Sequence, residues 1–163
     1  MSEVLVDTTG LWGLIFEDSK YHKFMTKLAE EKTLLISPLQ LLELLIVVYR
    51  EISDKGKDFK KGISMIKRIC EFLSEEEKLK AMGINLKSYP IEDKDILEAV
   101  KLVLNEGEIF IKEISGRRWI EFVDAVTALI WMKTGKELYT RDEKLMKFGE
   151  KHNLKYEVIL PSK

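Results

Sequence analysis

Four acidic residues of this 163-residue chain lie within or just after runs of apolar side chains, and no buried base is expected in the same segments. They are Asp7, Glu43, Asp124 and Asp142. An ionised carboxylate in apolar surroundings is costly unless it is paired with a base or coordinates a metal ion. Because the same segments offer no buried base, the pattern indicates a bound cation.

The elements that carry these acids alternate between strands and helices. Short runs rich in aliphatic residues predict strands at 4–6, 34–36, 84–89, 137–140 and 156–160. Helical spacing and capping signals predict helices at about 38–50, 59–73, 90–106, 119–133 and 142–152. This alternation predicts an α/β fold: a single domain, residues 1–163, with a central parallel β-sheet flanked by helices on both faces.

In such a sheet, the functional cleft lies beyond the carboxyl ends of the strands. Asp7 ends one predicted strand and Asp142 follows another by two residues, so both should reach that edge. Glu43 and Asp124 lie on the apolar faces of two helices and can point at the same place. Four converging carboxylates would form an oxygen-rich site, which suits Mg²⁺ or Mn²⁺.

Each acid also has a simpler interpretation when it is taken alone. Asp7 and Asp142 precede predicted helices and can serve as N-caps. Glu43 can pair with a neighbouring arginine, and Asp124 with an arginine from another turn or chain. These roles do not explain why one acid follows each of two strands while the others lie on two helices.

The joint pattern resembles a known family. Segments 4–11, 37–43, 122–128 and 138–142 look like the four motifs of PIN-domain ribonucleases, in the same order, and the resemblance covers nearly the whole chain. Within that family the chain is most similar to the VapC-like toxins of prokaryotic type II toxin–antitoxin pairs. The resemblance implies that the acidic quartet is catalytic and binds metal, with Thr8 and Thr140 as supporting hydroxyls.

The resemblance also implies an activity and partners. The chain is expected to hydrolyse phosphodiester bonds in single-stranded or structured RNA with Mg²⁺ or Mn²⁺, as the toxin of a toxin–antitoxin pair. A cognate antitoxin and a homodimer are the expected protein partners. Two positions depart from the family pattern: Thr9 stands where many members have asparagine or serine, and Lys144 where many have another acid. The interval between Glu43 and Asp124 is also long, which predicts a charged helical insertion at about 54–80.

The overall charge does not identify a nucleic-acid binder, because 27 basic residues oppose 28 acidic ones. Basic residues that hold RNA must therefore be local. The candidates are Arg117 and Arg118 beside Trp119, and the predicted helix face with Lys60, Lys61, Lys67 and Arg68. The alternative for each group is an ordinary solvated surface. We expect the tryptophans and the single cysteine, Cys70, to lie in the core, and both histidines, His22 and His152, at the surface.

Composition and motifs also limit the other function classes. The chain begins without a signal-like segment, and its longest apolar run is too short to span a bilayer, which predicts a cytoplasmic protein without membrane association. Two alternatives stay open: a PIN-like module that binds RNA or protein without cleaving, and a receiver-type phosphotransfer domain. The second needs another acid close to Asp7 or a lysine after a late strand, and the chain has neither.

Overall fold

The computed structural model describes residues 1–53 and 58–162. The first four residues of the predicted helical insertion, 54–57, lie outside these ranges. A five-stranded sheet forms the centre of the fold, in the order β3-β2-β1-β6-β7, and all its neighbouring strands are parallel. The strands are β1 (Glu3–Val6), β2 (Thr33–Ile36), β3 (Leu86–Ser88), β6 (Leu138–Thr140) and β7 (Tyr156–Val158). The predicted fold class is therefore confirmed.

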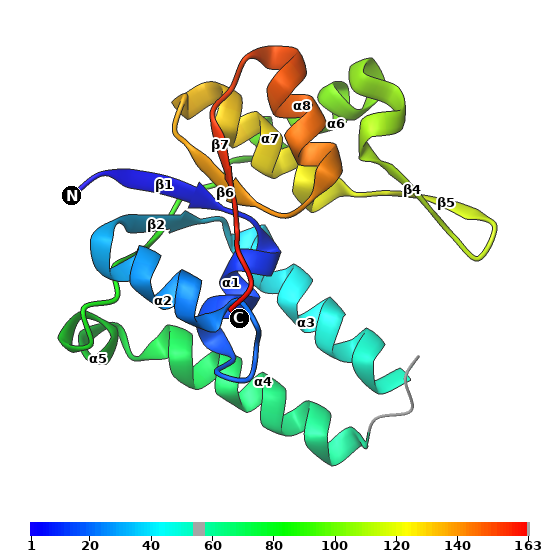
Figure 1. Cartoon of the computed structure of the whole chain (residues 1–163). Coiled ribbons are helices and arrows are strands. Elements are labelled where there is room, and N and C mark those ends of the chain that lie inside the picture. Colours follow the sequence, from blue (N-terminus) through cyan, green and yellow to red (C-terminus); the bar gives the residue numbers. More distant parts are fainter. Residues whose placement is uncertain (54–57, 163) are drawn as a thin grey trace.

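Helices cover both faces of this sheet (Figure 1). One face carries α1 (Thr8–Ile15), α2 (His22–Glu31), α3 (Pro38–Ser53), α4 (Phe59–Ser74) and α5 (Glu76–Ala81), and the other carries α6 (Asp93–Glu106), α7 (Phe122–Thr134) and α8 (Glu143–His152). Alternate strand residues supply the two cores: Val4 and Val6 enter one, and Leu5 enters the other. Burial on both faces explains why the strands read as continuous apolar runs.

The insertion predicted between Glu43 and Asp124 includes two helices, α4 and α5, and α4 packs along α3. The buried positions of α4 are Gly62, Ile69 and Phe72. Gly62 is the point of close approach, because a Cβ there would lie 2.0 Å from Cδ1 of Ile52. Apolar residues at helical spacing predict a buried stripe on this helix, formed by Phe59, Ile63, Ile66, Cys70 and Leu73. This prediction is wrong at three positions, since Phe59, Ile63 and Cys70 are exposed. Counting apolar side chains overlooked the glycine at the helix contact.

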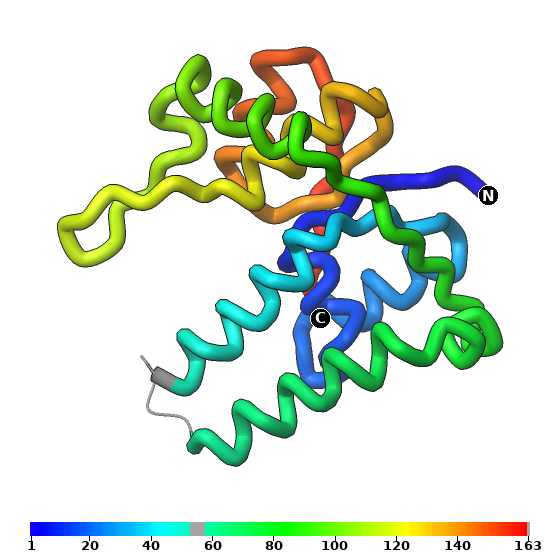
Figure 2. The backbone as a smooth tube through the Cα atoms, turned by 180° about the vertical axis from the view of Figure 1, so that it is seen from behind, coloured from blue at the N-terminus to red at the C-terminus, as the bar shows by residue number. Residues whose placement is uncertain are grey.

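A projecting β-hairpin precedes α7 (Figure 2). Its strands, β4 (Ile111–Ile114) and β5 (Arg117–Ile120), are antiparallel and separate from the central sheet. The predicted helix start at residue 119 is therefore wrong, because Trp119 and Ile120 are strand residues. The turn residues, Ser115 and Gly116, both have positive φ, +52° and +73°, which suits a two-residue hairpin turn.

The three tryptophans occupy different environments. Trp131 is fully buried, as predicted, and closely contacts Gly149, where a Cβ would lie 2.3 Å from its ring. Trp12 is partly buried, whereas Trp119 is 53% exposed on the hairpin, so the core prediction for Trp119 is wrong. His22 and His152 are partly buried, and His152 stacks on Phe148. In the described residues, no helix combines the length and apolar content that crossing a bilayer requires.

Candidate functional site

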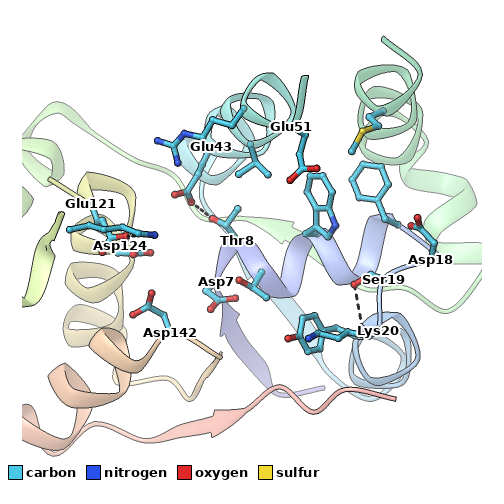
Figure 3. Close-up of a pocket in the computed structure, with 18 of the residues that line it drawn as sticks. Asp7, Thr8, Asp18, Ser19, Lys20, Glu43, Glu51, Glu121, Asp124 and Asp142 are labelled. Atoms are coloured by element: carbon cyan, nitrogen blue, oxygen red, sulfur yellow. Dashed lines mark hydrogen bonds and ion pairs between the residues drawn. The ribbon is translucent and has the colours of Figure 1, made fainter. Parts of the chain in front are cut away.

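The four predicted acids line one cavity of about 670 Å³ at the carboxyl edge of the sheet (Figure 3). Asp7 directly follows β1, and Asp142 follows β6 by two residues. Glu43 comes from α3 and Asp124 from the first turn of α7. In Figure 3, Asp124 and Asp142 lie at the left, Glu43 lies above them, and Asp7 lies to the right of the two aspartates and below Glu43. The sheet and its helices thus bring together the residues singled out in the sequence.

Asp7 is held by hydrogen bonds on both carboxylate oxygens and is only 3% exposed. Oδ1 accepts from the backbone N–H of Gly10 at 2.8 Å, which caps α1. Oδ2 accepts from Thr140 Oγ1 at 2.5 Å and from the N–H of Arg141 at 3.2 Å. Burial raises the pKa of Asp7 to about 6, although these hydrogen bonds favour the ionised form. Asp7 therefore caps a helix and lines the pocket at the same time.

Glu43 accepts a hydrogen bond from the hydroxyl of Thr8, the first residue of α1. Its pKa is raised, first by burial and also by the charges of Glu121 and Asp142, while the Thr8 hydrogen bond and the Arg50 charge oppose the rise. The hydroxyls of Thr8 and Thr140 thus each contact one carboxylate of the predicted quartet. Because both acids have protein donors, we call Asp7 and Glu43 the bonded side of the pocket.

The opposite side has three acids that face one another. Ligand oxygens of Glu121, Asp124 and Asp142 lie within 4.8 Å of one another. The pKa of Asp124 is well above its ordinary value, because of burial first and then of the charges of Asp142 and Glu43. No donor in the described part of the chain hydrogen-bonds the Asp124 carboxylate, so we call these three acids the open side.

Asp142 combines the capping role with a place in the pocket. Its Oδ1 accepts from the N–H groups of Lys144 at 2.7 Å and Leu145 at 3.0 Å, which caps α8. Among the described residues no hydrogen bond reaches Oδ2, so this oxygen can serve a ligand. The N-termini of α1, α7 and α8 all point at the cavity, and their partial positive charge favours anionic groups there.

Glu121 is a pocket acid that the sequence analysis did not select. It precedes Asp124 by three residues and is the N-cap of α7. Its two carboxylate oxygens meet lysines: Oε2 accepts from Lys144 Nζ at 3.2 Å, and Oε1 lies 3.6 Å from Lys112 Nζ. The available signal was its spacing, because residues three apart lie on the same face of a helix. Lys144 therefore faces the acidic cluster.

The basic residues considered for RNA binding have unequal surroundings. Arg117 has no ion-pair partner within the described residues, whereas Arg118 pairs with Glu108. Lys61 lines the cavity, and the neighbouring residue in the chain, Lys60, is exposed. The remaining two residues of the α4 group, Lys67 and Arg68, pair with Glu71 and Glu17, and Arg68 Nε also donates to the carbonyl of Ile15 at 3.2 Å.

The donor set fits a hard divalent cation. The acidic groups in the pocket offer oxygen, which Mg²⁺ and Mn²⁺ prefer, and the described lining residues include neither cysteine nor histidine, so the thioether of Met65 is their one sulfur. The open side gives a second reason, because the ionised carboxylates of Asp124 and Asp142, with oxygens within 4.8 Å, would repel each other by roughly 3 kcal/mol at an effective dielectric near 20, whereas Lys144 and Lys112 offset the charge of Glu121. A cation between them would remove that repulsion.

Several solved structures share this fold. The crystal structure of PAE2754 from Pyrobaculum aerophilum is similar over 90% of this chain and 86% of that chain, with a TM-score of 0.57 and 18% identity. VapBC2 from Rickettsia felis, bound to a DNA fragment from its promoter, matches over 96% and 98%, with a TM-score of 0.53 and 20% identity. FitAB bound to the IR36 DNA fragment matches over 95% and 94%, with a TM-score of 0.53 and 14% identity.

No protein-family model matches the sequence, and no curated protein matches it. At 14–20% identity, the structural likeness establishes the α/β fold over nearly the full length of both chains, and it leaves the activity to be argued from the site.

Proposed function

We propose that the chain is a PIN-type endoribonuclease that hydrolyses phosphodiester bonds in single-stranded or structured RNA with Mg²⁺ or Mn²⁺. The observation that carries this proposal is the convergence of Glu121, Asp124 and Asp142 within 4.8 Å, in a cavity that Asp7 and Glu43 also line. The order of the four sequence motifs and the fold of the similar structures support it.

In this mechanism, the acids of the open side and Asp7 would hold the divalent ion. A bound ion of this kind lowers the pKa of a coordinated water and neutralises charge on a phosphate. The chain itself positions these groups: Thr140 and the N–H of Arg141 orient Asp7, Thr8 orients Glu43, and the α8 N-terminus orients Asp142. No histidine lines the cavity, so a carboxylate is the group available to accept a proton.

We also propose that the chain acts as the toxin of a toxin–antitoxin pair in the cytoplasm, with a cognate antitoxin and a homodimeric assembly. The motif resemblance supports this assignment, as does the structural likeness to VapBC2 and FitAB. We expect a small reading frame next to the gene. Its purified protein product should bind the chain and stop RNA cleavage. A neighbouring protein that leaves cleavage unchanged would contradict the pairing.

The test of the activity uses purified chain and a mixed set of single-stranded and hairpin RNAs. Cleavage should require Mg²⁺ or Mn²⁺ and stop with a chelator. Asp124→Asn should abolish it, whereas Lys147→Gln, at an exposed position of α8 away from the pocket, should retain it. Metal-dependent RNA binding without any cleavage would instead identify a non-catalytic module. Cleavage that survives the chelator would contradict the mechanism.

A further inference from the structure

The β4–β5 hairpin stands apart from the rest of the fold. Both figures of the whole chain show it projecting from the body on the side where α3 ends. Seven of its eight strand residues are exposed, and Trp119 and Ile120 are 53% and 59% exposed. A two-stranded hairpin with so little burial is marginally stable in water, so two large apolar side chains at its surface need an explanation beyond folding.

The register of the hairpin separates its side chains into two chemically different faces. Directly paired residues point to the same side, and successive residues point to opposite sides. One face carries Lys112, Ile114, Arg117 and Trp119, and the other carries Ile111, Glu113, Arg118 and Ile120. The first face has two cations, an aromatic ring and no acid of its own, and we call it the basic face.

The basic face leads directly into the acidic cavity. Lys112 lines that cavity, and its Nζ lies 3.6 Å from Glu121 Oε1. Trp119 is the residue paired with Lys112 across the hairpin. Arg117 precedes Trp119 by two residues on the same face and lies closer to the turn. On the opposite face, the guanidinium of Arg118 is bound to Glu108. Two adjacent arginines therefore differ: Arg117 is available to an anion, and Arg118 is already paired.

We propose that the basic face is the platform for a single-stranded nucleic acid that enters the cavity, with Trp119 stacking on a base and Arg117 and Lys112 contacting phosphates. This inference rests on the proposed nuclease function and adds the path of its substrate. An exposed aromatic ring between cations is the combination that binds single strands without sequence preference, because every base has a face to stack on and every linkage has a phosphate. An acidic cavity also needs such a neighbour, since it repels a polyanion.

Binding is tested without cleavage, so that a failure of the platform is distinguishable from a failure of the nuclease assignment. The probe is a fluorescent 2′-O-methyl RNA oligonucleotide, which cannot be cleaved through its own 2′-oxygen, titrated at several salt concentrations in chelator, which withholds the metal ion that the proposed hydrolysis requires. Trp119→Ala should weaken binding by about tenfold, within the range measured for one base–aromatic stack, and Trp119→Phe should restore most of the loss. Arg117→Ala should reduce the salt slope by about one.

The matched controls lie on the other face. Arg118→Ala and Ile120→Ala should bind the probe like wild type, because their side chains point away from the platform. Equal losses for Arg117→Ala and Arg118→Ala would overturn the proposal, since the effect would then be general charge. Unchanged binding in Trp119→Ala would also overturn it. If that variant instead loses self-association in sedimentation while binding the probe normally, the face belongs to a second copy of the chain, and the proposal is wrong.

Discussion

The two sides of the cavity hold their carboxylates in different ways. On the bonded side, Asp7 has three donors and Glu43 has one, all supplied by the protein. On the open side, Asp124 has none among the described residues, and its neighbours are acids within 4.8 Å. Burial raises the pKa on both sides, but hydrogen bonds oppose the rise only for Asp7 and Glu43.

This difference indicates a division of roles. The bonded side is part of the folded structure whether or not a ligand is present, because its oxygens already have partners. The open side is unfavourable in the metal-free protein and becomes favourable only with a cation. Buried charges without partners persist in proteins mainly where function requires them, so Asp124, which has no donor among the described residues, makes the open side the stronger indication of a metal centre.

The largest expected effect is on catalysis. Asp124→Asn should reduce RNA cleavage by more than about a hundredfold, because it removes a proposed ligand rather than a group that supports one. Thr8→Val should cost about 10- to 100-fold, the usual range for loss of an outer partner. Initial rates of cleavage at saturating Mg²⁺ measure both. If Thr8→Val is the more damaging variant, the division into two sides is wrong.

The next effect has opposite signs on the two sides. Without metal, Asp124→Asn should stabilise the fold by about 1 to 2 kcal/mol, because it removes repulsion, and raise the melting temperature by about 2 to 8 °C. Asp7→Asn should destabilise it by about 1 to 3 kcal/mol, because an amide cannot accept from all three donors. Mg²⁺ should stabilise wild type much more than Asp124→Asn. Thermal melts in chelator and in Mg²⁺ give all of these values.

A third effect concerns pH. The folded pKa of Asp7, about 6, exceeds the ordinary value of 3.8, so the folded state binds more protons between these values. The metal-free protein should therefore lose stability as pH rises from about 4 to about 6, by up to roughly 3 kcal/mol from this group. Metal affinity should rise over the same range, because bound metal displaces protons. Denaturant melts in chelator give the free energy of unfolding at each pH. This free energy should vary less with pH for Asp124→Asn than for wild type, and an identical pH dependence would exclude Asp124 from the titration.

Much of this comparison follows from the sequence. The strand ends fixed Asp7 and Asp142 at one edge, because parallel strands place their carboxyl ends together. Helical spacing placed Glu43 and Asp124 toward it. The sequence could not distinguish the bonded side of the cavity from the open side. That difference depends on hydrogen-bond donors that are distant in the chain, such as Thr140, which lies 133 residues from Asp7.

The failures of prediction have local causes. Residues 119–132 are mostly apolar on both sides of Glu121, so no clear sequence signal marks the boundary at which strand β5 ends and α7 begins. The Ser115–Gly116 pair between two short runs was the signal for the hairpin. The same error explains why Glu121 was not predicted as a site residue. In a helix that begins at residue 119, Glu121 looks like an ordinary helix residue near Asp124. The α4 stripe failed because Gly62, which has no side chain to count, is the contact with Ile52.

The smallest expected effect concerns Lys144, whose ammonium group faces the open side. Its Nζ donates to Glu121 Oε2 and to the carbonyl of Ile111, so it competes with a metal ion for one of the three carboxylates. A partly exposed pair of this kind contributes up to about 1 kcal/mol, which corresponds to about fivefold in affinity. Lys144→Gln should therefore tighten Mn²⁺ binding by about two- to fivefold, measured by calorimetry.

Lys112→Gln should have a smaller effect, because the Lys112 ammonium lies 3.6 Å from Glu121 without a hydrogen bond and is more exposed. Lys147→Gln, on the same helix as Lys144 and exposed, controls for the general loss of a positive charge. If Lys144→Gln and Lys147→Gln change the Mn²⁺ affinity equally, the lysine acts only through net charge. Glu121 would then be a partner of Lys144 and Lys112, and the open side would consist of Asp124 and Asp142 alone.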